Sequence, residues 1–99
     1  MKGTYNQLSI VKKISDQVSC DMAGEAIVLN LKSGVYFGMD EVGALIWSLL
    51  EKPRTIGEIR DAILEEYDVD SDSCDRDLMS FLDSLQTAGL VEIDNDTTA

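Results

Sequence analysis

The stretch EAIVLNLKSGVYFGMDEVGALIWSLL, residues 25–50, decides the fold of this chain. Apolar side chains stand at every second position of residues 27–31, which is the period of a half-buried β-strand. Residues 32–34 (KSG) supply a turn, and the alternation resumes over residues 35–39. These residues therefore predict a tight β-hairpin.

The second strand of this hairpin has two faces. Val35, Phe37 and Met39 share one side, and Tyr36 and Gly38 share the other. We expect the first side to belong mainly to the core. Gly38 leaves two interpretations open, because a glycine near a strand end either relieves crowding or lets a second backbone approach closely.

A helix is expected to follow the hairpin without a linker. The Asp40 carboxylate is a good N-cap, since it can accept hydrogen bonds from the free N–H groups of a first helical turn. The apolar residues that follow have the spacing i, i+3, i+4 and i+7: Val42, Leu45, Ile46 and Leu49. Trp47 lies within this apolar helix, so we expect it in the core.

Two more strands precede the hairpin in the sequence. Residues 7–14 predict a short edge strand and residues 18–22 a second strand, so the first half of the chain is expected to form an antiparallel meander. Another short strand is expected at residues 90–93. The whole chain, residues 1–99, predicts one domain, with residues 17–93 as its core and loosely ordered termini.

Two more helices are expected in the second half. Pro53 ends the first helix, and Thr55 with Glu58 forms a capping box at the start of the next. The third helix is expected to end at Gly89 in the left-handed conformation. Each helix has one apolar stripe: Ile56, Ile59, Ile63 and Tyr67 on the second, and Cys74, Leu78, Phe81, Leu82 and Leu85 on the third.

These elements predict an α+β domain of winged helix-turn-helix-like type, with three helices and an attached antiparallel sheet. DNA binding is the usual function of such a fold, and a transcriptional regulator is the alternative. The chain has 8 basic and 19 acidic residues and a net charge of −11, which disfavours nucleic acid and anionic membranes. The third helix has four carboxylates against Arg76: Asp72, Asp75, Asp77 and Asp83.

Composition also disfavours an enzyme or a metal protein. The chain has no histidine, which is the commonest general base and metal ligand, so we expect no catalytic site, no metal and no cofactor. The acidic residues 65–72 lack the glycine and closing glutamate of a calcium loop and predict a solvated turn. Cys20 and Cys74 have no C-x-x-C spacing, so free, partly buried thiols are expected. Without a signal-peptide or membrane-spanning apolar run, the expected location is the cytoplasm.

Three segments, VLNLKSGVYFGMDEVGALIWSLL, TIGEIRDAILEEYDVD and LMSFLDSLQTAGLV, resemble the PqqD family. Members are small leader-peptide recognition elements of pathways for ribosomally made, post-translationally modified peptides. The resemblance covers about residues 18–93, and its most specific parts are residues 36–47 and 81–90. Residues 1–14 extend beyond the shared pattern.

The resemblance implies a three-stranded antiparallel sheet packed on three helices. It also implies a non-catalytic protein that binds the leader of a precursor peptide and presents it to a processing enzyme. The leader would add antiparallel to the third strand, in the groove between that strand and the third helix. The enzyme would be a leader peptidase in lasso-peptide pathways or an iron–sulfur enzyme in radical pathways. The discrete chain and its Y-F-G-M junction favour the lasso type.

The residues independently predict strand addition. Residues 34–39 would be the last strand of a meander, whose open edge presents unpaired N–H and C=O groups. We expect Leu78 and Leu82 to be primarily core, with Met79 as the apolar residue on a flank that also carries Asp83 and Gln86. The predicted peptide-binding residues are Val35, Tyr36, Phe37, Gly38, Met39, Asp75, Leu78, Met79 and Leu82.

Overall fold

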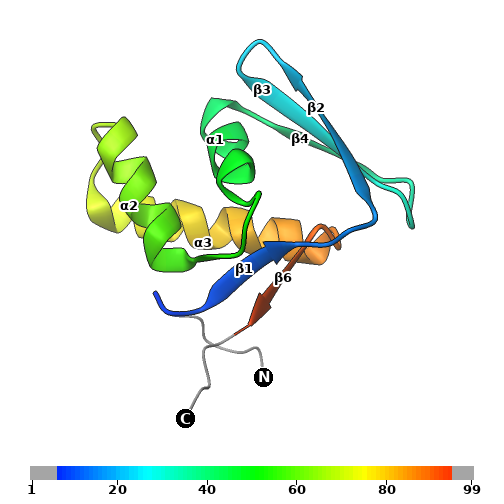
Figure 1. Ribbon diagram of the computed structural model, residues 1–99. Coiled ribbons are helices and arrows are strands. Elements are labelled where there is room, and N and C mark those ends of the chain that lie inside the picture. The colour runs from blue at the N-terminus through cyan, green and yellow to red at the C-terminus, as the bar shows by residue number, and fades with distance from the viewer. Residues whose placement is uncertain (1–6, 95–99) are drawn as a thin grey trace.

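A computed structural model describes residues 7–94 of the chain. Three helices, α1 (Glu41–Leu49), α2 (Ile56–Glu66) and α3 (Ser71–Thr87), pack with two small sheets (Figure 1). The strands are β1 (Ile10–Lys13), β2 (Gln17–Met22), β3 (Glu25–Asn30), β4 (Tyr36–Met39), β5 (Arg54–Thr55) and β6 (Val91–Asp94). The predicted α+β fold with three helices is confirmed. The predicted frayed termini lie outside the described residues.

The helices begin and end where the local sequence predicts. The Asp40 carboxylate accepts a hydrogen bond from Gly43 N at 2.9 Å, which caps α1. Thr55 and Glu58 form both hydrogen bonds of the predicted capping box at the start of α2. Gly89 follows α3 with φ of +75°, a conformation that glycine adopts without steric cost.

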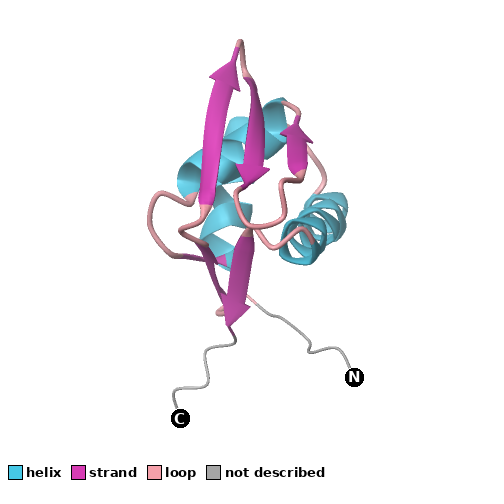
Figure 2. Cartoon of the chain, turned by 90° about the vertical axis from the view of Figure 1, so that its right-hand side faces the viewer, coloured by secondary structure: helices cyan, strands magenta, loops and turns pink. Residues whose placement is uncertain are grey.

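The first sheet has the strand order β2-β3-β4 and is antiparallel throughout. Figure 2 shows the short β4 at its edge. The alternation of β3 is confirmed, but its buried side chains are Ala26, Val28 and Asn30, whereas Ile27 faces outward. The pairing explains this choice, because Val28 lies opposite Phe37 and Ala26 lies opposite Met39 on the face toward the helices.

The second sheet, with the order β5-β1-β6, corrects the predicted meander. The predicted edge strand at residues 7–14 pairs with β5 and β6 rather than with β2. Burial accounts for this pairing. Val11 of β1 is fully buried and lies opposite Ile93 of β6, which is also buried, so the two strands together cover one side of the core. The two-residue strand β5 was not predicted.

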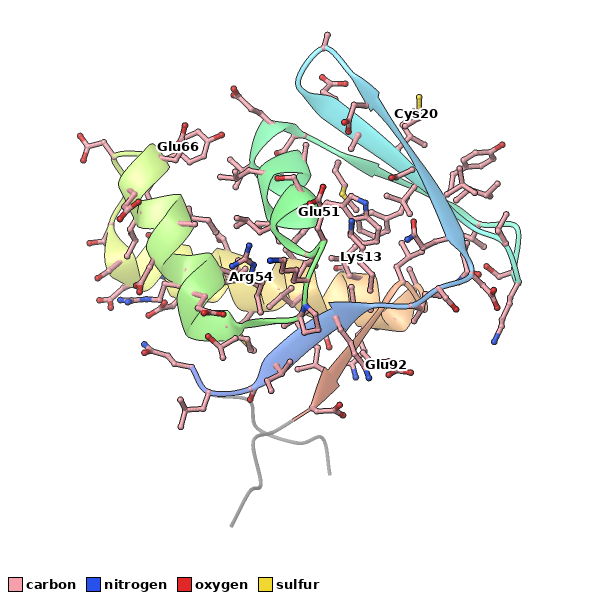
Figure 3. The ribbon with its side chains drawn as sticks, viewed as in Figure 1. Lys13, Cys20, Glu51, Arg54, Glu66 and Glu92 are labelled. Carbon is pink, nitrogen blue, oxygen red and sulfur yellow. The ribbon has the colours of Figure 1, made fainter. Side chains whose placement is uncertain are left out.

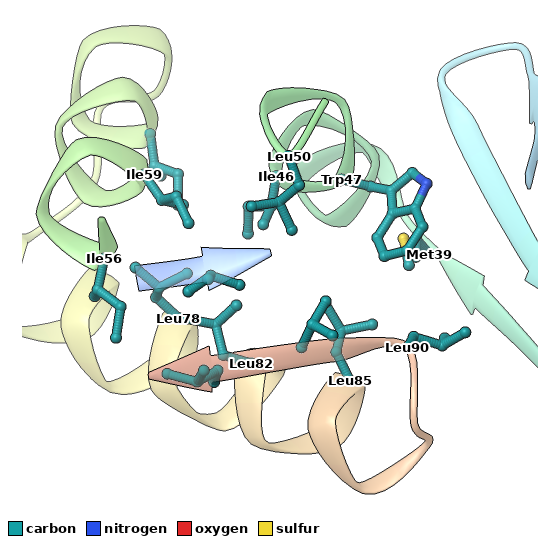
Figure 4. Close-up of a cluster of buried hydrophobic side chains, with 14 of the residues drawn as sticks. Met39, Ile46, Trp47, Leu50, Ile56, Ile59, Leu78, Leu82, Leu85 and Leu90 are labelled. Atoms are coloured by element: carbon teal, nitrogen blue, oxygen red, sulfur yellow. The ribbon is translucent and has the colours of Figure 1, made fainter. Parts of the chain in front are cut away.

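The core lies between the helices and the two sheets (Figure 4). Trp47 is buried beside Met39, as predicted, and the Lys13 ammonium lies 4.4 Å from the centre of its ring. Desolvation lowers the pKa of Lys13, although Glu51 and Asp21 oppose this shift. Most of the labelled side chains come from the three helices, and Met39 ends β4. The same buried cluster contains Val11, Val91 and Ile93 of the second sheet, so one continuous core holds both sheets.

Both cysteines are free thiols. Cys74 is buried, as α3 requires, but Cys20 is exposed on β2 rather than partly buried. Among residues 7–94, no helix has the length and apolar character needed to span a bilayer. No group of three or more metal-binding side chains comes together within that range either.

Candidate functional site

The outer edge of β4 is open, since β3 is its neighbour on one side and the sheet ends there. Asn30 N donates to Val35 O at 2.9 Å, which makes these two residues a hydrogen-bonded pair of the antiparallel ladder. Pairs of this kind alternate, so Phe37 and Met39 also direct their backbone groups toward β3. The backbone groups of Tyr36 and Gly38 therefore point to the open edge.

Phe37 and Phe81 form the floor beside this edge. Their rings meet edge to face, with centroids 6.1 Å apart and planes at 72°. Gly43 of α1 lies directly behind them, because a Cβ at this position would be 3.1 Å from the Phe81 ring and 3.0 Å from Met39 Cβ. The close approach at Gly43 fixes β4, α1 and α3 against one another, with the open edge of β4 beside α3.

A cavity of about 420 Å³ continues the floor past the end of β4. It lies between the start of α1, the end of α2 and the first half of α3. Asp40 and Asp77 bring carboxylates to an otherwise mainly apolar lining, which includes Val42, Ile46, Ile63, Val69, Leu78 and Phe81. Such a cavity can take one apolar side chain and offer acceptors to a hydrogen-bond donor at its tip.

Two of the titratable groups that line the cavity, Cys74 and Tyr67, are shifted toward their neutral forms. Desolvation, followed by the charge of Asp75, raises the pKa of the Cys74 thiol. Desolvation, followed by the charge of Glu41, raises the pKa of the Tyr67 phenol. A thiol with a raised pKa is protonated at neutral pH and is a poor nucleophile.

The five predicted residues of the hairpin have different positions. Tyr36 is 69% exposed, and Gly38 has no side chain to cover the edge. Phe37 is half-buried in the floor, whereas Met39 is buried in the core. The prediction of Val35 as core is wrong, because this residue lies in the turn before β4 and is exposed.

The predicted residues of α3 do not come together beside β4. Leu78 and Leu82 are core residues, and Leu78 also lines the cavity. Asp75 forms an ion pair with Arg60 of α2 and so faces that helix. Met79 is two positions from Phe81, or about 200° around the helix, so it lies on the opposite flank from β4. Sequence reasoning placed Phe81 in the apolar stripe but assigned the groove to the other flank.

The face of the first sheet that points away from the helices is apolar. Val18, Leu29 and Tyr36 lie side by side across the three strands, and Cys20, Ile27 and Gly38 form the next row. Val18 is 54% exposed, and Figure 3 shows Cys20 on the side of the sheet away from the helices. We call these six residues the outer face. The outer face could not be identified from the sequence, because the alternation alone does not show which of the two sets of side chains points to the core.

Comparison with known proteins gives a family match and two similar structures. The family model described as coenzyme PQQ synthesis protein D (PqqD) matches residues 25–91. The structure of TbiB1 in complex with the TbiA(beta) leader peptide is 44% identical, with a TM-score of 0.77 over 82% of this chain and 94% of that chain.

A lasso peptide synthetase B1 complexed with the leader peptide has a TM-score of 0.67 at 18% identity, over 83% of this chain and 96% of that chain. At this identity the likeness shows the fold alone. No curated protein matches the chain. The family model spans more than half of the 99 residues, and TbiB1 shares close to half of its aligned residues with this chain. The chain therefore belongs to the PqqD family.

Proposed function

We propose that this protein binds the leader of a ribosomally made precursor peptide by adding it as a strand to the open edge of β4. The observation that carries the proposal is the position of this edge beside the Phe37–Phe81 floor. Outward-pointing backbone groups at Tyr36 and Gly38 provide affinity that does not depend on sequence, and the floor adds apolar contacts. The 44% identical TbiB1, solved with a leader peptide, supports the same ligand class.

The direction of the leader determines which of its side chains meets the cavity. In an antiparallel arrangement, the N-terminal end of the added strand lies opposite Met39, the C-terminal end of β4. The cavity begins just beyond this point, at Asp40. A side chain near the N-terminal end of the bound segment therefore enters the cavity. The rest of the precursor leaves the groove past Tyr36 and Val35.

The outer face is the surface that we assign to the processing enzyme. It belongs to the same sheet as β4, so an enzyme seated there lies next to the bound leader. A second copy of the chain fits poorly, because each copy has a net charge of −11 and places Glu25 at the end of this face. An enzyme surface with an apolar centre and basic side chains at its rim complements the face. We assign the lasso type of pathway, with a leader peptidase as the enzyme.

We further propose that the protein itself is non-catalytic, needs no cofactor and acts in the cytoplasm. The thiol in the cavity is held protonated, and the chain has no histidine that could act as its general base. A role as a transcriptional regulator is not favoured, because Asp72, Asp77 and Asp83 on α3 repel the phosphates of DNA.

Calorimetric titration with the TbiA(beta) leader peptide tests the proposal. We expect a dissociation constant below about 1 μM, a typical value for a specific peptide complex, or −8.2 kcal/mol. Gly38→Pro removes a backbone N–H that points to the edge, and we expect at least tenfold weaker binding. A DNA duplex serves as the second titrant. Binding of the duplex without binding of the leader would overturn the proposal.

A further inference from the structure

The side chain of Asn30 connects two parts of the molecule that form the groove. This residue ends β3, is only 6% exposed and stands 58 positions before Ala88, the C-cap of α3. Its Nδ2 group donates to Ala88 O at 2.9 Å and to Gly89 O at 3.3 Å. Its Oδ1 atom accepts from Lys32 N at 2.9 Å and from Ser33 N at 3.2 Å. One amide thus holds the turn before β4 and the end of α3 together.

We propose that Asn30 is a positioning residue for leader binding, because it sets the orientation of the β4 edge relative to α3. This inference rests on the proposed function. Phe37 and Phe81 join β4 to the middle of α3, and the Asn30 amide joins the preceding turn to its end. The close approach of Gly43 to Met39 and Phe81 lies near the first of these contacts, so the Asn30 amide is the one that holds the far end of α3, and two well-separated contacts fix a direction.

The chemistry of this link requires an amide. The carbonyls at the end of a helix need a donor, while the N–H groups of the turn need an acceptor, and an asparagine side chain supplies both. Gly89 allows the close approach, since a Cβ there would lie 2.9 Å from Asn30 Nδ2. Aspartate has nearly the same shape and retains the acceptors of the turn, but it places an oxygen against two carbonyl oxygens.

Rotation of the sheet affects the leader in particular. A leader strand bonds to the backbone of Tyr36 and Gly38 and at the same time contacts Phe81 on α3. Both sets of contacts form together only if the distance and angle between β4 and α3 are correct. Loss of the Asn30 link therefore lowers leader affinity while the buried apolar contacts of the core stay in place.

Asn30→Asp is the test variant, and Val11→Ala is the control. Val11 is fully buried in the second sheet, so its truncation lowers stability without touching the groove. Both chains are titrated with the TbiA(beta) leader peptide at a temperature where each is folded by circular dichroism. We expect Asn30→Asp to bind at least tenfold more weakly than the parent and Val11→Ala to bind within twofold of it.

Residual dipolar couplings of the backbone amides provide a second readout that needs no ligand. In Asn30→Asp, we expect that the couplings measured in β4 and in α3 no longer fit the relative orientation that these two elements have in the structure. In Val11→Ala, we expect that they still fit it. Unchanged couplings, a parent-like affinity of Asn30→Asp, or an equal loss in Val11→Ala would each overturn the role of Asn30. Failure of the parent itself to bind the leader would instead refute the proposed function, and the couplings would still decide whether Asn30 orients β4.

Discussion

The ring of Phe37 in β4 meets the ring of Phe81 in α3 edge to face, with centroids 6.1 Å apart. The two residues are 44 positions apart in the sequence, and their contact places the open edge of the first sheet beside the third helix. An edge-to-face pair contributes about 0.5–1.5 kcal/mol beyond the area that it buries. Phe81 also lines the cavity beyond β4, so it connects the two parts of the proposed site.

Truncation of this ring is expected to weaken leader binding. Phe81→Ala removes the α3 side of the floor and one wall of the cavity, and we expect a loss of at least about 1.4 kcal/mol, or tenfold, in affinity for the TbiA(beta) leader peptide. Leu64→Ala is the matched control, since Leu64 is a partly buried apolar residue of α2 that does not line the cavity. Equal affinities of the two variants, measured by calorimetry, would exclude Phe81 from the site.

Two glycines are expected to respond differently to alanine. In Gly43→Ala the new Cβ lies 3.0–3.1 Å from Met39 and the Phe81 ring, so α1 must move away from β4. Overpacking of this kind costs about 1–3 kcal/mol, which outweighs the gain of up to about 1 kcal/mol in helix propensity. In Gly38→Ala the Cβ meets nothing within 4 Å. Thermal unfolding compares the two, and a Gly43→Ala chain as stable as Gly38→Ala would contradict the close packing.

The two thiols are expected to react at different rates. Cys20 is exposed on the outer face and reacts with a thiol reagent in the folded protein, whereas Cys74 is buried and reacts only after unfolding. Saturation with leader peptide leaves the Cys20 rate unchanged, because β2 and β4 are at opposite edges of the sheet. Mass spectrometry identifies the labelled residue, with Cys20→Ser as the control. Protection of Cys20 by the leader would place the leader on the outer face.

Cys74 is expected to make stability depend on pH in the alkaline range. Its folded pKa is raised by desolvation, so the folded chain retains the thiol proton after the unfolded chain has lost it. Stability therefore falls as pH rises from the unfolded pKa, about 8.5, toward the higher folded value. Urea unfolding at several pH values is expected to show a steeper fall for the parent than for Cys74→Ala. Parallel curves for the two chains would contradict the raised pKa.

Local features of the fold could be predicted from the sequence, because each depends on residues close together in the chain. The caps at Asp40 and Thr55 and the end of α3 at Gly89 follow from hydrogen bonds within one helical turn. The open edge at residues 36–39 follows from the last strand of a meander. From these features, most of the part of the site that β4 contributes could be predicted.

The remaining features depend on contacts between distant residues. The alternation of β3 fits two registers, and the pairing of Val28 with Phe37 selects the one that exposes Ile27. The flank of α3 that faces β4 is set by the Phe37–Phe81 contact, which no helical period reveals. The link from Asn30 to Ala88 spans 58 positions, and the separation of β1 into a second sheet depends on its pairing with β6.

Amide hydrogen exchange with and without leader peptide tests strand addition most directly, because the first sheet contains its own control. Tyr36 and Gly38 point their amides to the open edge of β4. At the other open edge, the bond from Leu31 N to Asp16 O fixes the ladder, so the amides of Ser19 and Asp21 point outward from β2. Saturating TbiA(beta) leader peptide is expected to slow exchange at Tyr36 and Gly38 at least tenfold and to leave Ser19 and Asp21 unchanged. Slower exchange at Ser19 and Asp21 instead, or at neither pair, would contradict addition of the leader to β4.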